Sequence, residues 1–237
     1  MLDLQAVDTA IAQLRHRRAT LPEHGQLARL EDERSAASAD LVAAETRVCD
    51  LEVAQRQAES DLEPVRQRRV RNQQRIDDGS VADAKALTGL VEEIQHLERR
   101  INDLEDAELE LMEQLENAAA ERDDLAARNA ELEGRIGEVV ARRDEQLAVI
   151  DGELAANAEE RSAIAADLPE PLVATYDKLR TSHGGVGAAE LRNRRCTGCQ
   201  LEVNAADLRT FAAAPDDEVL RCEECGRILV RTINSGL

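Results

Sequence analysis

The chain has 237 residues, and its 49 Asp and Glu residues outnumber its 30 Lys and Arg residues, giving a net charge of −19. Aromatic residues are limited to Tyr176 and Phe211. Compact domains of this length normally bury several large aromatic side chains, so the composition favours thin helical assemblies over a compact enzyme. The acidic balance also argues against a protein that coats nucleic acid or anionic membranes along its whole length.

Cellular location is predicted from two absences in the sequence. No apolar run approaches the roughly 18 residues that a membrane-spanning helix needs. The opening residues Met1–Gln5 have neither the basic nor the apolar region of a secretion signal. We therefore expect a cytoplasmic protein without a membrane partner, in a reducing compartment where five clustered cysteines favour metal binding over disulfides.

The first predicted element is a short helix over residues 2–18, whose apolar side chains recur at helical spacing. They are Leu4, Val7, Ile11 and Leu14. Thr20-Leu21-Pro22-Glu23 has the pattern of a capping box, which predicts a second, ascending helix over residues 21–77. The ascending helix is shorter than the descending helix predicted below over residues 81–167. The first helix is therefore expected to cover part of the descending helix that extends beyond the ascending one.

A heptad pattern occupies most of the chain. Apolar residues alternate by three and four from Leu27 to Val65, and again from Leu87 to Ile150. So narrow a seam is typical of a coiled coil, in which each helix packs against one partner. Cys49 lies beside the seam position Val48, and we expect it to be a small buried residue.

The seam is interrupted at residues 77–80, where Gly79 can end a helix in the left-handed conformation. Ser80-Val81-Ala82-Asp83 is a second capping-box pattern, which predicts a descending helix over residues 81–167. A break of four residues returns the chain antiparallel. We therefore predict one intramolecular hairpin, although the sequence does not separate a monomer from a dimer of arms.

The carboxyl-terminal part changes character. Pro169 and Pro171 end the long helix, and the glycine-rich residues 182–187 are typical of a flexible joint. Short β-rich segments follow. We accordingly expect a hairpin domain over residues 1–170, a linker over 171–189 and a small domain over 190–237.

The small domain carries two CxxC pairs separated by 22 residues. The four cysteines are Cys196, Cys199, Cys222 and Cys225. Four thiolates complete a tetrahedral shell and predict one structural zinc ion. Redox motifs are the alternative, but no βαβ unit surrounds either pair. Because the shell is closed and no HExxH motif is present, we expect no enzyme activity.

Arginines near the cysteines allow two interpretations. They could neutralise the negative charge of the thiolates around the metal, or they could contact nucleic-acid phosphates. The candidates for nucleic-acid contact are Arg192, Arg194, Arg195, Arg221 and Arg227. Neutralisation is favoured, because the domain has no basic excess and Phe211 is its one aromatic residue.

A second basic cluster precedes the hairpin turn. Five arginines occur there without an acidic residue among them: Arg66, Arg68, Arg69, Arg71 and Arg75. The favoured interpretation is a solvated face that pairs with acids of the returning helix, such as Asp83 and Glu92. The other is a docking site for an anionic partner. Asp77 and Asp78 at the turn could also present carboxylates, as in coiled-coil factors that enter the RNA polymerase secondary channel.

Several motifs occur together in this chain: Leu4-Gln5-x-x-Asp8, Leu21-Pro22, Leu168-Pro169 before Tyr176, Gly184-Gly185-Val186-Gly187, Cys196-Thr-Gly-Cys199 and the Arg221–Leu229 run. Together they resemble the bacterial C4-type zinc-ribbon family of coiled-coil proteins. The composition, rich in Arg and Ala and poor in Lys, fits an actinobacterial member. The resemblance implies an adaptor or chaperone-like role. Members are described as predicted nucleic-acid-binding ribbons, and some relatives bind an alternative sigma factor, secretion or flagellar components, or an mRNA.

We therefore predict a mainly α-helical protein, with a long antiparallel coiled-coil hairpin followed by a small β zinc ribbon that holds one zinc ion. The predicted function is that of a non-enzymatic adaptor that binds protein partners, and the ribbon could also contact nucleic acid. The alternative is a regulator that acts directly on RNA polymerase through the hairpin tip. The sequence does not identify the partner.

Overall fold

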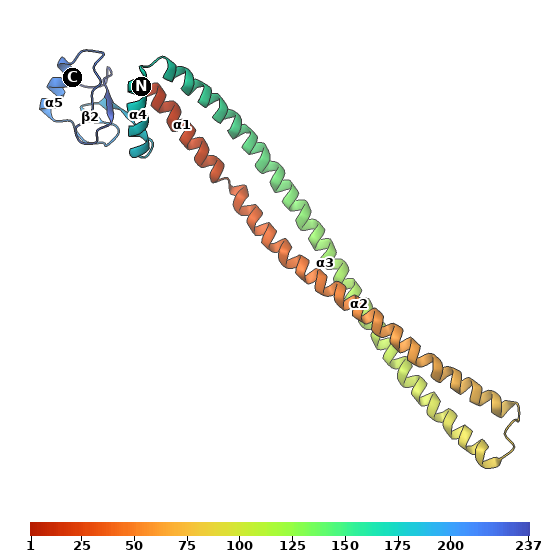
Figure 1. Ribbon diagram of the computed structural model, residues 1–237. Helices are drawn as coiled ribbons and strands as arrows, with labels where there is room; N and C mark the ends of the chain where they lie inside the picture. Colours follow the sequence, from red (N-terminus) through yellow and green to blue (C-terminus); the bar gives the residue numbers. More distant parts are fainter. The chain divides into compact units, whose positions relative to one another are not determined.

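The computed structural model describes all 237 residues, which form five helices and three strands (Figure 1). The chain divides into two compact units. The hairpin unit comprises residues 26–139, and the ribbon unit comprises residues 1–25 and 140–237. Helices α2 (Pro22–Asp77) and α3 (Ala84–Ala166) contribute to both units. None of the helices has the length and apolar character required to cross a membrane.

Within the hairpin unit, α2 and α3 run antiparallel and side by side. Arg47 pairs with Glu121 at 3.4 Å, and Arg66, further along α2, pairs with Glu105 at 2.5 Å. From the first ion pair to the second, the residue number rises on α2, from 47 to 66, and falls on α3, from 121 to 105. The two helices are therefore antiparallel. The predicted coiled-coil hairpin is confirmed, and both of its helices belong to one chain.

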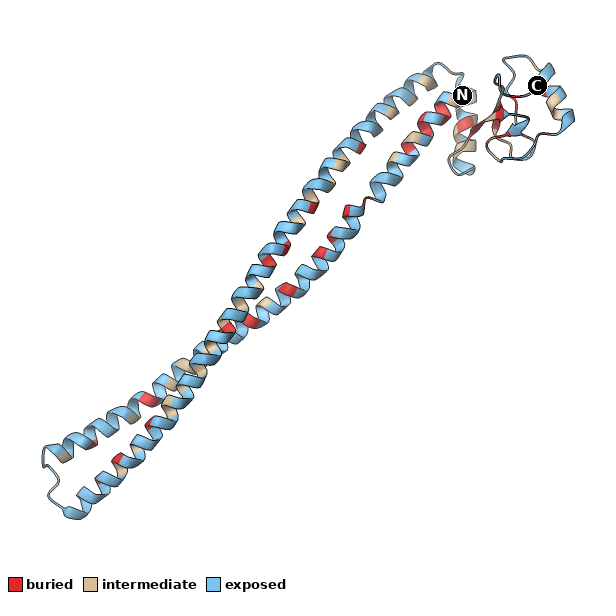
Figure 2. Cartoon of the chain, turned by 180° about the vertical axis from the view of Figure 1, so that it is seen from behind, coloured by how far each residue is buried: buried red, intermediate tan, exposed pale blue.

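The buried apolar residues of the hairpin unit follow the predicted seam, and Figure 2 shows buried positions recurring along both helices. They are Leu27, Leu30, Ala37, Ala44, Val48 and Leu62 on α2, and Leu90, Ile94, Ile101, Ala118, Leu132 and Val139 on α3. Asn129 is also buried in the seam, where its Oδ1 accepts a 3.1 Å hydrogen bond from Ser38. A buried asparagine at such a position favours one register of the coiled coil. Cys49 is exposed, so its predicted burial was wrong.

The turn of the hairpin is longer than predicted. Helix α3 begins at Ala84, because Asp83 caps it: the Asp83 carboxylate accepts a 2.9 Å hydrogen bond from the amide of Ala86. Ser80 does not cap this helix, since its hydroxyl donates to the carbonyl of Arg75. The capping box predicted for the start of α3 is therefore wrong.

Two other predictions concern helix ends. Gly79 has the left-handed conformation that was predicted, with φ +64°. The capping box predicted at Thr20 is wrong, because the Thr20 hydroxyl donates to the carbonyl of His16 in the preceding helix. Helix α2 nevertheless begins close to the expected residue, at Pro22.

In the ribbon unit, helix α1 (Leu2–Ala19) covers the carboxyl-terminal part of α3. Arg18 of α1 pairs with Asp151 at 3.3 Å, and Asp8 pairs with Arg161 at 2.8 Å. The amphipathic first helix thus covers the excess of the longer limb. Helix α4 (Glu170–Ser182) follows, so most of the stretch expected as a linker is helical.

The ribbon carries a three-stranded sheet in the order β2-β1-β3. Strand β1 (Ala188–Arg192) is antiparallel to β2 (Arg195–Cys196) and parallel to β3 (Ile228–Val230). Helix α5 (Ala205–Ala213) lies between the two cysteine pairs in the chain. Asn204 caps this helix by accepting hydrogen bonds from the amides of Ala206 and Asp207.

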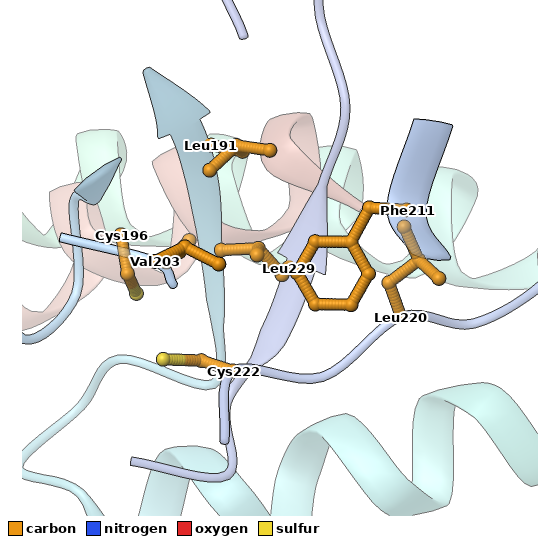
Figure 3. Packing of buried hydrophobic residues seen from close by; sticks show 8 residues of the cluster. Leu191, Cys196, Val203, Phe211, Leu220, Cys222 and Leu229 are labelled. Carbon is orange, nitrogen blue, oxygen red and sulfur yellow. The ribbon is translucent and has the colours of Figure 1, made fainter. Parts of the chain in front are cut away.

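Two apolar clusters build the ribbon unit. The first lies inside the ribbon and surrounds Phe211, whose ring lies beside Leu220 and Leu229 (Figure 3). The second joins the ribbon to the helices, because it combines Leu4 of α1 and Tyr176 of α4 with Ala188 and Ile228 of the sheet. Each of the two aromatic residues of the chain therefore fills one cluster.

Candidate zinc centre

The four predicted ligands meet in the ribbon, where their sulfurs all lie within 4.8 Å of one another. The Sγ–Sγ distance is 3.9 Å between Cys196 and Cys225 and 3.8 Å between Cys199 and Cys222. A tetrahedral ion with Zn–S bonds of about 2.3 Å requires sulfurs about 3.8 Å apart. The residues therefore fit one zinc ion, which would cross-link the two CxxC pairs and contribute folding energy.

Backbone turns bring the sulfurs of each pair around the centre. The amide of Gln200 donates to the carbonyl of Cys196, and the amide of Gly226 donates to that of Cys222. Gln200 and Gly226 both have the left-handed conformation, with φ of +65° and +69°. Gly198 is required for a different reason, the close approach of Arg227. A Cβ at residue 198 would lie 2.7 Å from the Arg227 side chain.

The sulfur environments differ. Burial raises the pKa of the Cys196 thiol and raises that of Cys222 to about 12. Burial also raises the pKa of Cys225, but hydrogen bonds from the backbone and side chain of Arg227 outweigh that effect and lower the pKa to about 7. Because zinc binds thiolates, its binding to this cluster must release protons from the buried thiols.

Arg227 connects the metal site to the segment before the ribbon. Besides its contact with Cys225, its guanidinium donates to the carbonyl of Val186 at 2.9 Å and to that of His183 at 3.1 Å. Arg227 was a candidate for nucleic-acid contact, yet its hydrogen bonds are made inside the ribbon unit. It places a positive charge beside the thiolates, as the neutralisation interpretation expects.

The glycine-rich joint is hydrogen-bonded to the first helix. The side-chain oxygen of Gln5 accepts hydrogen bonds from the amides of Gly187 at 2.7 Å and Ala188 at 3.2 Å. The Gln5 amide group donates to the carbonyl of Gly185 at 3.0 Å. A Cβ at residue 187 would lie 2.6 Å from the carbonyl oxygen of Tyr176, so only glycine fits there.

A buried polar cluster supports the same junction. Tyr176, which is fully buried, donates its hydroxyl to Asp8 at 2.9 Å. Asp8 is 3% exposed and is also paired with Arg161 at 2.8 Å and Arg180 at 3.3 Å. Two arginines thereby compensate a carboxylate that would otherwise be costly to bury.

The tip-proximal arginines divide into two groups. Three of them pair with glutamates of α3: Arg66 with Glu105 at 2.5 Å, Arg68 with Glu93 at 2.5 Å and Arg69 with Glu98 at 3.6 Å. Arg71 and Arg75 are exposed and have no carboxylate partner. At the turn, Asp77 accepts a hydrogen bond from Gln73, and Asp78 is exposed.

The other four candidates for nucleic-acid contact, Arg192, Arg194, Arg195 and Arg221, are exposed. Arg192 pairs with Glu190 of its own strand at 2.6 Å. Arg194 donates to the carbonyl of Gly236 at 3.0 Å but has no carboxylate partner. Arg195 and Arg221 also lack one. Nucleic-acid contact by these residues stays a prediction.

Comparisons with known proteins agree with this architecture. The family described as the CT398-like coiled coil hairpin domain matches residues 4–184. The chain belongs to this family. The C4-type zinc ribbon domain matches residues 195–229, which contain all four cysteines. The resemblance drawn from the sequence motifs is thus confirmed.

Similar proteins occur in mycobacteria, as expected for an actinobacterial member. A protein of Mycobacterium tuberculosis is 32% identical over 231 residues, which cover 98% of this chain and 94% of the relative. A solved structure from Mycobacterium smegmatis has 34% identity and a TM-score of 0.83, with 97% of this chain and 95% of that one covered. CT398 from Chlamydia trachomatis has 16% identity and a TM-score of 0.68, covers 98% and 95%, and shows the shared fold.

The sequence predicted that four cysteines meet, which the structure confirms, but it did not indicate which residues hold the ribbon against the helices. Gln5, Asp8 and Tyr176 entered only as parts of motifs shared with the family, without a structural role. For Gln5 and Asp8, the signal was the occurrence of polar residues on the otherwise apolar face of the predicted first helix. Such residues need hydrogen-bond partners when buried, and here the partners are Gly187 and Tyr176.

Proposed function

We propose that this protein is a non-enzymatic, zinc-binding adaptor that holds protein partners. The observation that carries the proposal is the tip surface, defined as Arg71 and Arg75, where two exposed arginines have no carboxylate partner in a chain of net charge −19. They lie four residues apart and therefore on the same side of α2. This pair suits an anionic surface on a protein partner.

The zinc centre supports a structural role for the metal. Catalytic zinc keeps a coordination position open for water or substrate. Cys196, Cys199, Cys222 and Cys225 would supply four ligands to one ion and leave no position open. The ion would then stabilise the ribbon, and binding would be the task of the protein surface.

The experiment is affinity purification of the tagged full-length protein from native extract, with identification of the proteins that co-purify. Reversal of both charges, Arg71→Glu with Arg75→Glu, should remove the partner while zinc content and helicity stay unchanged. Because neither arginine is paired in the hairpin, the substitutions break no ion pair. Nuclease treatment of a parallel sample should leave the partner bound if the contact is between proteins.

The matched control is Arg128→Glu with Arg135→Glu, which makes the same charge change at two exposed arginines of α3 in the hairpin unit. The control should retain the partner. Loss of the partner in both double variants would indicate a general charge effect and refute the tip surface. Retention of the partner by the Arg71 and Arg75 variant would refute it as well.

A second candidate function is direct regulation of RNA polymerase through the tip. The observation that favours it is the exposure of two consecutive carboxylates, Asp77 and Asp78, at the hairpin turn. Asp77→Asn with Asp78→Asn should then abolish an effect on transcription by purified polymerase. The same variant should leave adaptor binding through the tip arginines intact.

A further inference from the structure

A groove of about 370 Å³ lies on the ribbon along one side of α5. Ala205, Leu208 and Ala212 form the apolar part of its lining on α5, called the floor below; they recur at intervals of three and four residues and so lie on one face of the helix. Leu208 also packs on the ribbon core. Leu237, which is 49% exposed, adds a further apolar surface.

Two arginines line the same groove, and neither has a carboxylate partner. Arg194 donates its Nε to the carbonyl of Gly236 at 3.0 Å, and Arg209 donates its Nε to the carbonyl of Ala205 at 3.2 Å. These bonds hold each side chain while its terminal guanidinium nitrogens stay available. Paired terminal nitrogens are the donors that recognise a carboxylate bidentately.

Arg194 occupies a backbone position at which glycine would be preferred. Asn193 and Arg194 form the two-residue turn between β1 and β2, with φ of +48° and +64°. Such turns favour glycine at the second position, because left-handed backbone crowds a Cβ. The turn is held by hydrogen bonds from the amides of Asn193 and Arg194 to the carbonyls of Asn234 and Ser235. Disfavoured backbone of this kind concentrates at functional sites.

We propose that this groove docks an acidic amphipathic helix of a protein partner. Arg194 and Arg209 bind carboxylates of that helix, and the floor of Ala205, Leu208 and Ala212 receives its apolar side chains. Apolar anchors three and four residues apart are how amphipathic helices enter grooves. The groove and the tip surface consist of different residues, so the result of testing this proposal does not depend on Arg71 and Arg75.

The test uses a displayed library of 14-residue helical peptides, selected against the zinc-loaded full-length protein. Selected peptides should be rich in Asp and Glu beside Leu or Ile. Their affinity, measured by fluorescence anisotropy, should fall about tenfold or more in Arg194→Gly, since charge-assisted hydrogen bonds are lost. The ribbon of this variant should melt no earlier than the parent, because glycine relieves the turn.

Two further variants make the test specific to the groove. Ala212→Trp fills the floor at an exposed position and should abolish peptide binding at unchanged zinc content. Arg195→Gln removes an exposed arginine that does not line the groove and should bind peptide like the parent. Enrichment of basic peptides, no enrichment, or binding unaffected by Arg194→Gly and Ala212→Trp would overturn the proposal.

A 20-nucleotide RNA serves as the competing probe. Under the proposal, RNA does not displace the selected peptide at physiological salt. If RNA displaces the peptide, and its own binding requires both Arg194 and Arg195, the surface is a nucleic-acid face and the proposal is refuted. Its salt dependence would then be steep, as phosphate contacts require.

Discussion

The side-chain oxygen of Gln5, near the start of α1, accepts a 2.7 Å hydrogen bond from the amide of Gly187, directly before the ribbon sheet. The two residues are 182 positions apart in the chain. Gln5 also donates to the carbonyl of Gly185 and accepts from the amide of Ala188. The first helix therefore holds the backbone through which the chain enters the zinc ribbon, and a segment that would otherwise be flexible becomes part of the ribbon unit.

Replacing Gln5 with alanine should destabilise this junction. The amides of Gly187 and Ala188 would lose their acceptor, and an unsatisfied buried group costs about 1–3 kcal/mol. Hydrogen exchange of residues 185–188 should accelerate in Gln5→Ala at unchanged zinc content. Gln13→Ala, at an exposed position of the same helix, should exchange like the parent. Equal exchange in both variants would contradict the role of Gln5.

Two glycine-to-alanine substitutions should have opposite effects. Gly187→Ala should lower the free energy of unfolding by about 1–3 kcal/mol, because its Cβ would overlap the Tyr176 backbone. Gly152→Ala should raise it by about 1 kcal/mol, since this glycine lies exposed within α3 with open space around it. Chemical denaturation measures both. Stabilisation by Gly187→Ala would show that the close approach is not present in solution.

Tyr176 should make stability fall at alkaline pH. Burial and the hydrogen bond to Asp8 raise the pKa of its phenol above the ordinary value, so folding favours the neutral form. The resulting stabilisation is fully present below about pH 10 and is lost as the pH rises above that value. Tyr176 is the one tyrosine of a chain without tryptophan, so absorbance at 295 nm reports its ionisation directly.

The control for this titration is the denatured protein, in which ionisation should occur near pH 10. The folded protein should ionise at a higher pH, and Tyr176→Phe should show a flatter loss of stability above pH 10. If folded and denatured protein ionise together, the phenol is not buried as described.

Arg227 and Arg221 should behave differently although both adjoin zinc ligands. Arg227→Gln removes the donors to His183 and Val186 and the contact with Cys225. We expect zinc to leave this variant faster in the presence of a chelator, and residues 183–186 to exchange amide hydrogens faster. Arg221 is exposed, so Arg221→Gln should match the parent in both assays. Identical chelation rates in all three proteins would refute the positioning role of Arg227.

The parts of the fold that could be predicted are those encoded by local periodicity or spacing. The heptad seam identified the hairpin, because apolar residues at alternating three and four positions must share one face. The two CxxC pairs predicted a cluster of four cysteines that fits one zinc ion, because two such pairs can close a tetrahedral shell. Both signals can be recognised without knowing which distant residues meet.

The junction and the helix caps could not be predicted in this way. The partners of Gln5 lie about 180 residues further along the chain, and nothing local pairs them. Ser80 and Asp83 are both good capping residues, so the choice of Asp83 depends on the path of the turn. In the sequence, Arg221 and Arg227 are both arginines close to the second CxxC pair, and nothing distinguishes their roles. In the structure, Arg227 donates a hydrogen bond to the carbonyl of Val186, whereas Arg221 does not.

The most direct test of the account is X-ray absorption at the zinc edge of the purified full-length protein, together with metal analysis. A closed structural centre predicts one zinc per chain with four sulfur ligands at about 2.3 Å and no nitrogen or oxygen ligand. Cys199→Ser should lose most of the metal. A zinc ion with three sulfur ligands and one oxygen ligand in the parent protein would reveal a position open to water and contradict the non-enzymatic adaptor.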